Sequence, residues 1–206
     1  MTGGASRSLR LLALGGSYTI GEGVAPADRW PEQLAQRLRQ SGAAVASPQV
    51  VAVTGWTAAE LAEGLDEADP RGPFDLVTLG IGVNDQYREA SVDAYRDEVG
   101  ALMDRAVALA GGSARRVVVV SIPDWGVTPF GAADARGPAR IADGVDTFNA
   151  VAQAEADARG IPWVDVTDLS RQQGDQTVDD GLHPDARAYA AWTDRIEPAA
   201  RAALAG

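Results

Sequence analysis

The stretch LRLLALGGSYT, from Leu9 to Thr19, decides the fold, because its apolar run ends abruptly in two glycines and a serine. A short aliphatic run without polar alternation is typical of a strand that helices cover on both faces. Similar runs follow along the chain at Gln49–Val53, Phe74–Leu79, Arg116–Val120 and Ile161–Val166. Together with Leu9–Leu14, they predict five strands.

Longer segments with helical periodicity separate these runs, at Trp30–Gln40, Thr57–Asp66, Ser91–Ala110, Pro138–Arg159 and Pro184–Leu204. Their ends carry the expected signals: a capping box from Thr57 to Glu60, N-caps at Ser91 and Asp185, and stops at Gly42, Gly111 and Gly160. Alternating strands and helices predict a three-layer α/β/α fold with a parallel sheet in the middle layer. We expect one domain over residues 1–206. The segment 121–137 has no clear period and is expected to form a lid, a pocket wall or a simple long connection.

The composition excludes several kinds of chemistry. The 206 residues contain no cysteine, no lysine and one histidine, which excludes thiolate nucleophiles, cysteine-ligated zinc, Schiff-base lysines and the P-loop lysine. A single histidine also excludes a His-rich metal site and leaves only carboxylate-type sites for hard cations. We expect neither a metal nor a cofactor. The formal net charge of −11 argues against a nucleic-acid partner. The first apolar run is too short for a signal peptide and no stretch is long enough to span a membrane, so we expect a cytoplasmic protein.

The residues that can take part in catalysis follow the strands. Ser17 follows the first strand, Gly55 the second and Asn84 the third, while Asp180 and His183 lie between the last strand and the last helix. Right-handed crossovers bring the carboxyl ends of parallel strands to one edge of the sheet, where open α/β sheets bind ligands. The sequence therefore predicts that these five residues meet.

Their chemistry fits nucleophilic catalysis. Ser17 offers a hydroxyl that reacts only when a base removes its proton, and His183 is the only histidine that can be that base. Asp180 can fix the imidazole tautomer, with Asp179 as an alternative. The Asn84 amide and the backbone N–H groups of Ser17 and Gly55 are candidate donors to an oxyanion.

Each of these residues also has a simpler interpretation. Ser17 can belong to a glycine-rich phosphate loop, although the glycine spacing of known phosphate motifs is not met. Gly55 and Asn84 can be ordinary turn residues. Four aromatic residues are candidates either for an acyl pocket or for packing in a core or lid: Trp56, Tyr87, Trp125 and Phe130.

Four blocks of sequence, in this order, resemble the SGNH hydrolases, also called GDSL-type lipases and esterases. The blocks are ALGGSYT at 13–19, TGWT at 54–57, GIGVND at 80–85 and DGLHP at 180–184. The resemblance implies a flavodoxin-like sheet of order 2-1-3-4-5 and a serine–histidine–aspartate acyl hydrolase. It also favours Asp180 over Asp179, and it implies that Ser17, Gly55 and Asn84 build the oxyanion hole.

One position departs from the family pattern, which has aspartate where this chain has Gly16. The loss of that carboxylate is expected to loosen the oxyanion hole. On this basis Gly16→Asp is expected to raise kcat on short esters by roughly 10-fold, about 1.4 kcal/mol of barrier. The alternative is that neighbouring groups compensate for the glycine.

The sequence therefore predicts a serine esterase that acts on small or medium acyl esters without a metal or cofactor. Thioesters, lysophospholipids and sugar acetates remain open as substrates, as does the oligomeric state. Two other functions also remain open. One is a non-catalytic or impaired protein that binds acyl groups or carbohydrates, and the other is a flavodoxin-like domain that binds a nucleotide or phosphate.

Overall fold

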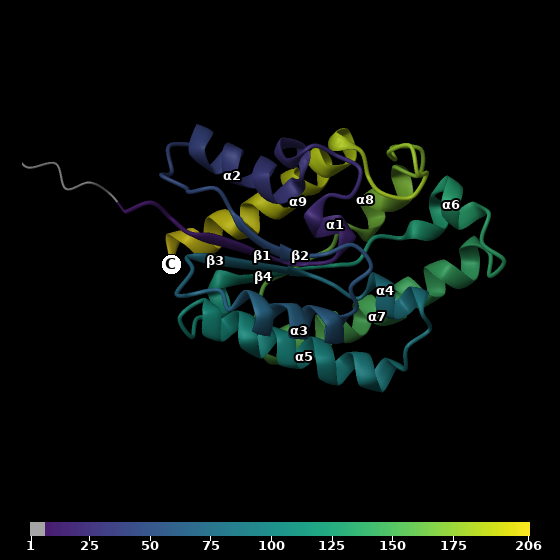
Figure 1. Ribbon diagram of the computed structural model, residues 1–206, viewed down its shortest axis with the longest axis horizontal. Helices are drawn as coiled ribbons and strands as arrows, with labels where there is room; N and C mark the ends of the chain where they lie inside the picture. Colours follow the sequence, from purple (N-terminus) through teal and green to yellow (C-terminus); the bar gives the residue numbers. More distant parts are fainter. Residues whose placement is uncertain (1–6) are drawn as a thin grey trace, which may run out of the picture.

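A five-stranded parallel sheet forms the centre of the computed structural model, which describes residues 7–206 (Figure 1). The strands are β1 Leu11–Gly15, β2 Gln49–Ala52, β3 Leu76–Gly80, β4 Val117–Val120 and β5 Trp163–Val164. Their order is β2-β1-β3-β4-β5, and every neighbouring pair is parallel. The predicted fold class and strand order are confirmed.

The burial and length of several strands follow from their composition. All residues of β1 and β4 are buried, as their aliphatic side chains on both faces predict. β5 is shorter than the predicted run from 161 to 166, and it pairs only with the end of β4. Pro162 directly precedes β5 and has no N–H to donate, although its carbonyl still accepts from Val119.

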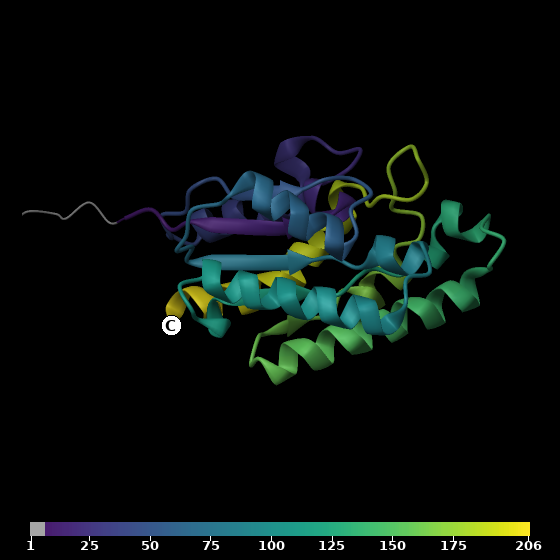
Figure 2. The same cartoon turned by 60° about the horizontal axis from the view of Figure 1, so that its bottom comes forward.

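Helices cover both faces of the sheet. The α-helices are α1 Ser17–Ile20, α2 Trp30–Gln40, α3 Ala58–Ala68, α4 Val83–Tyr87, α5 Val92–Leu109, α6 Pro129–Ala132, α7 Pro138–Ala158, α8 Thr167–Gln172 and α9 Ala186–Ala205. Three short 3-10 turns are η1 Pro26–Asp28, η2 Ala114–Arg116 and η3 Trp125–Val127. Helices α2 and α9 lie on one face, and α3, α5 and α7 lie on the other (Figures 1 and 2).

The boundaries of the five long helices follow from their sequences. Each predicted helix is present, with its ends within two residues of the prediction. The Thr57–Glu60 capping box is present, and the side chains of Ser91 and Asp185 accept hydrogen bonds from the first turns of α5 and α9. The glycines at 42, 111 and 160 follow helix ends with positive φ angles of 95°, 72° and 65°, which glycine adopts without a steric penalty.

The carboxyl ends of the strands lie at one edge of the sheet, and short elements follow three of them directly. α1 begins two residues after β1, α4 follows β3, and η3 with α6 follows β4. The segment 121–137 is thus partly helical rather than a simple connection. Within residues 7–206, no helix is both long enough and apolar enough to cross a bilayer.

Candidate active site

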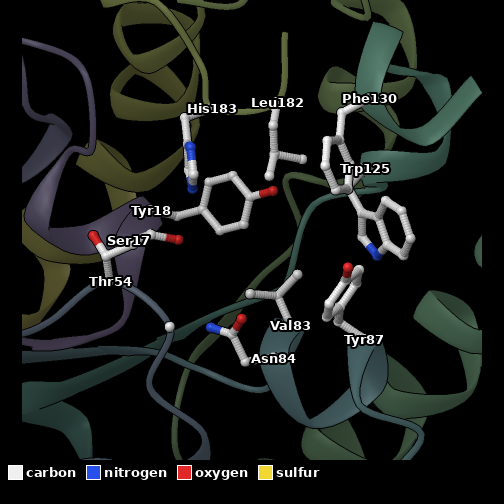
Figure 3. A pocket seen from close by; sticks show the side chains of 11 residues that line it. Ser17, Tyr18, Thr54, Val83, Asn84, Tyr87, Trp125, Phe130, Leu182 and His183 are labelled. Atoms are coloured by element: carbon white, nitrogen blue, oxygen red, sulfur yellow. The ribbon is translucent and has the colours of Figure 1, made fainter. Parts of the chain in front are cut away.

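A cavity of about 220 Å³ opens at the carboxyl edge of the sheet, with Ser17, Asn84 and His183 in its wall (Figure 3). Its complete lining is Ser17, Tyr18, Thr54, Gly55, Val83, Asn84, Tyr87, Trp125, Phe130, Leu182 and His183. Elements far apart in the chain contribute these residues, from α1 to the loop before α9. The structure therefore brings Ser17, Gly55, Asn84 and His183 to one cavity.

The loop before α9 holds His183 against a carboxylate. The His183 Nδ1 atom lies 2.6 Å from Asp180 Oδ2, and Asp180 Oδ1 accepts from the backbone N–H groups of Leu182 at 2.8 Å and His183 at 3.0 Å. This tight turn requires a positive φ of 68° at Gly181. The ring of His183 thus has its Nδ1 side occupied, which leaves Nε2 for a second partner. The paired carboxylate is Asp180 and not Asp179.

The electrostatics of this pair favour an ionised carboxylate. Burial alone would raise the pKa of the Asp180 carboxyl, but the hydrogen bonds from the His183 ring and from the two backbone N–H groups hold it below its usual value. An ionised Asp180 can stabilise a positive charge that develops on the imidazole.

Ser17 lies at the start of α1, and its side chain points toward the imidazole of His183 (Figure 3). It is only 4% exposed, so the hydroxyl is accessible mainly through the cavity. Among the described residues, 7–206, this hydroxyl makes no hydrogen bond. Contacts between a nucleophile and its base are often long in unliganded sites and shorten when substrate binds.

Two backbone donors near Ser17 are free. Within the part of the chain that the structure describes, neither the Ser17 N–H nor the Gly55 N–H donates a hydrogen bond. Gly55 has a φ of 90°, which glycine adopts readily, and it lines the cavity. Both N–H groups are therefore available to a ligand.

The Asn84 side chain is held in one orientation. Its Nδ2 atom donates to the backbone carbonyl of Trp56 at 3.0 Å. An amide nitrogen carries two hydrogens, so the second N–H of Asn84 remains available at the cavity wall. In Figure 3 the amide nitrogen is on the side of Asn84 that faces Ser17.

Aromatic residues form the far wall of the cavity. Trp125 is buried and donates from Nε1 to Gln86 Oε1 at 2.7 Å, whereas Tyr87 is 42% and Phe130 is 40% exposed. Their ring centroids lie 5.4 to 6.4 Å apart. The Arg136 guanidinium lies 4.8 Å from the Tyr87 centroid and 4.9 Å from that of Trp125. The segment 121–137 therefore supplies a pocket wall.

The structure corrects the expectation for Trp56. Its ring packs against α3, where Gly64 leaves the necessary space, because a Cβ on Gly64 would lie 2.1 Å from Trp56 Cη2. The Trp56 side chain is accordingly absent from the lining of the cavity. What Trp56 presents to the site is its backbone carbonyl, and sequence patterns do not indicate such a contact.

Four lining residues were not predicted: Tyr18, Thr54, Val83 and Leu182. Each is the immediate neighbour of a predicted site residue, so adjacency was the available signal. Tyr18 is the most specific of them, since its ring lies 5.4 Å from the His183 ring, centroid to centroid. Within residues 7–206, no group of three or more His, Cys, Asp or Glu side chains is arranged to hold a metal ion.

Comparison with known proteins gives one family. The model of the GDSL-like lipase/acylhydrolase family matches residues 13–191. No curated protein matches the sequence.

Several solved structures share the fold. A crystal structure of TesA has a TM-score of 0.74 at 20% identity and covers 95% of this chain and 99% of its own. The psychrotrophic esterase EstA from Pseudoalteromonas sp., inhibited by monoethylphosphonate, has a TM-score of 0.73 at 16% identity, over 96% of this chain and 99% of that one. A lipase/acylhydrolase from Enterococcus faecalis has a TM-score of 0.69 at 19% identity, with coverages of 92% and 94%.

Proposed function

The chain belongs to the GDSL-like lipase/acylhydrolase family, and on this premise we propose that it is a serine esterase with Ser17, His183 and Asp180 as its catalytic triad. The observation that carries the proposal is the arrangement around one cavity. His183 is paired with Asp180 at 2.6 Å, and the imidazole and the Ser17 side chain point toward one another.

The chemistry proceeds through two acyl transfers. His183 Nε2 removes the Ser17 proton as Oγ attacks the ester carbonyl, and the C=O π electrons move onto the carbonyl oxygen. The N–H groups of Ser17, Gly55 and Asn84 donate to this oxyanion. When the intermediate collapses, the C–O bond to the alcohol breaks and His183 returns the proton to the leaving oxygen. A water molecule then releases the acyl group by the same steps.

The cavity supports small or medium acyl groups as substrates. Its volume of about 220 Å³ lies below the roughly 300–1,000 Å³ that is typical of pockets for drug-sized ligands. The apolar far wall suits a hydrocarbon chain. We propose that the substrate is a small ester dissolved in water and that the reaction uses no metal or cofactor.

The test is a series of p-nitrophenyl esters of increasing acyl length, hydrolysed by the unaltered protein, Ser17→Ala and His183→Ala. Each substitution should lower kcat by roughly 10³- to 10⁶-fold, and the double variant should lose little more, because the two groups act in one step. Ser113→Ala is a suitable control, since Ser113 precedes β4 at the opposite edge of the sheet.

Near-normal hydrolysis by Ser17→Ala would contradict this mechanism. Ester binding without turnover, insensitive to Ser17 and His183, would instead indicate the non-catalytic binding protein. Phosphate bound at residues 15–17 would favour the phosphate-binding alternative.

A further inference from the structure

Three side chains of the α4 region form hydrogen bonds with the segment that follows β2 and with the start of α3. We call this segment, residues 53–57, the Gly55 loop. Asn84 Nδ2 donates to the Trp56 carbonyl at 3.0 Å, and Arg88 Nη2 donates to the Gly55 carbonyl at 2.8 Å. The Asp85 carboxylate accepts from the N–H of Ala58, the first residue of α3, at 3.1 and 3.2 Å. The Gly55 loop is therefore fastened to α4 along its second half.

The opposite side of the loop receives no such support from residue 16. A Cβ at Gly16 would lie 3.4 Å from the Trp56 carbonyl oxygen and 3.7 Å from Asn84 Nδ2, which are ordinary contact distances. A side chain at this position would thus touch both the loop and Asn84, but glycine has none. Elsewhere on the loop, the Thr54 hydroxyl donates to Glu22 and Thr57 is bound by Glu60 of α3, while the carbonyls of Gly55 and Trp56 are held by Arg88 and Asn84 from the α4 region.

Arg88 binds the backbone at the only glycine in the loop sequence, Gly55. Glycine restricts its own backbone least, so an N–H on Gly55 is well placed only if neighbouring groups fix the chain. Arg88 holds the Gly55 carbonyl, and the N–H of the same peptide group, on Trp56, donates to the Val53 carbonyl at 3.3 Å. The peptide that follows Gly55 is thus bound at both its oxygen and its nitrogen, while the Gly55 N–H remains free.

We propose that Arg88 is a positioning residue of the oxyanion hole, which holds the Gly55 N–H in place and supplies the support that Gly16 cannot give. The inference rests on the proposed esterase function. Arg88 acts through Gly55, and it is not in the lining of the cavity. Its other nitrogen, Nη1, lies 3.1 Å from Glu60 Oε1, which fixes the guanidinium from the first turn of α3.

The effect of this contact should appear in the rate and not in the stability. The Arg88 side chain is 50% exposed and its partner Glu60 is 39% exposed, and ion pairs with such exposure contribute little to folding. A displacement of an oxyanion donor, in contrast, weakens a contact that matters most in the transition state.

The decisive variant is Arg88→Met, which keeps an apolar stem of similar length but removes the donors. We expect kcat on a short p-nitrophenyl ester to fall by about 10-fold, with KM within about 2-fold of the unaltered protein and the melting temperature almost unchanged. Arg88→Lys keeps a donor for the Gly55 carbonyl and should recover part of the loss. Arg140→Met is the matched control, because it removes an exposed arginine that pairs with Glu89 at 3.2 Å outside the cavity.

Titration of active sites with a fluorophosphonate shows how many molecules can react, so that kcat refers to active sites only. The inference is overturned if Arg88→Met keeps the full kcat for each active site. It is equally overturned if Arg88→Lys and Arg88→Met lose the same activity together with stability. If the unaltered protein shows no hydrolysis that depends on Ser17, the proposed esterase function itself fails, and the role of Arg88 fails with it.

Discussion

The two N–H groups of the Asn84 amide have different surroundings. One N–H fixes the side chain on the Trp56 carbonyl, and the other is available at the cavity wall next to Ser17. If the second N–H binds the oxyanion, Asn84→Ala should lower kcat by roughly 10²- to 10³-fold with little change in KM, because a donor used in the transition state is lost. Steady-state kinetics on a short activated ester measures this.

A second measurement distinguishes catalysis from support of the loop. Fluorophosphonate labelling of Ser17 also places an oxygen in the hole, so the labelling rate of Asn84→Ala should fall as well. If Asn84 only holds the Gly55 loop, the variant should lose no more kcat for each labelled site than Arg88→Met does, about 10-fold, together with a lower melting temperature. Normal labelling together with normal turnover would remove Asn84 from the oxyanion hole.

Gly16 is the position where the structure changes an expectation. The sequence predicted about a 10-fold gain in kcat from Gly16→Asp, or about 1.4 kcal/mol. The Asn84 amide, however, already donates to the Trp56 carbonyl, and a new carboxylate would lie beside that carbonyl oxygen and compete with it. We therefore expect Gly16→Asp alone to change kcat by less than about 3-fold, which corresponds to roughly half of the barrier change expected from the sequence.

The gain should be larger once the support from α4 is weakened. In the Arg88→Met background the loop has lost the hydrogen bond to the Gly55 carbonyl, so packing of a side chain at position 16 against the loop restrains it more than in the unaltered protein. Gly16→Asp should therefore recover more activity in this background than it adds to the unaltered protein. A double-mutant cycle on kcat measures this coupling. Equal effects in both backgrounds would show that residues 16 and 88 do not support the same structure.

At the scale of elements, sequence patterns located the long helices and missed the short ones. The apolar stripes of α2, α5 and α7 span several turns, so their periodicity is unambiguous. α1 and α4 have four and five residues, too few to show a period. Tertiary contacts decide their conformation, and these two helices carry Ser17 and Asn84. The residues of the site were therefore more predictable than the elements that present them.

The start of α3 links an element to the site, because it lies two residues after the Gly55–Trp56 pair. Thr57 Oγ1 accepts from Glu60 N at 3.3 Å, and Glu60 Oε2 accepts from Thr57 N at 2.8 Å. Thr57→Ala should cost about 1 kcal/mol of stability, a decrease in melting temperature of about 2–4 °C for a chain of this length. It should also lower kcat, since the Gly55 loop loses its anchor at α3.

Ser91→Ala is the matched control for this cap. Ser91 caps α5 by accepting from Ala94 N at 3.1 Å, and it does not line the cavity. The two variants should lose similar stability, measured by thermal unfolding, while only Thr57→Ala loses kcat. If both variants keep a normal kcat, the start of α3 has no influence on the site.

At the scale of the whole molecule, the meeting of Ser17, Asn84 and His183 was predictable because topology enforces it. Parallel strands with right-handed crossovers place their carboxyl ends at one edge, whatever the side chains are. The far wall of the cavity was not predictable in the same way. Phe130 and Trp125 reach the cavity through a segment without periodicity, and the Trp56 ring turns toward α3 because Gly64 leaves room there. Contacts of this kind depend on packing between distant segments.

One buried carboxylate gives global stability a pH dependence. Asp85 is 1% exposed. Burial raises the pKa of its carboxyl group to about 6, and nearby Glu98 adds to the rise, while the hydrogen bond from Ala58 N–H and the charge of Arg88 oppose it. In the unfolded chain an aspartate has a pKa of about 3.9. Between these two values, the folded protein binds a proton at Asp85 that the unfolded chain does not.

The free energy of unfolding should therefore rise as the pH falls from about 6 to about 4. Above pH 6, the ionised and buried Asp85 destabilises the folded state to its full extent. The pKa difference corresponds to about 3 kcal/mol over the whole window, and to roughly 1–2 kcal/mol between pH 8 and pH 5.

The Asp85→Asn variant cannot ionise at this position, so it should lack this gain in stability. Carboxyl groups whose pKa is lowered in the fold, such as those of Asp75 and Asp180, act in the opposite direction and lose their contribution at lower pH. Urea unfolding of both proteins at pH 8, 6 and 5 isolates the effect of Asp85, because every other group is common to the pair. Parallel stability curves for the two proteins would show that Asp85 is ionised in the folded state throughout this range.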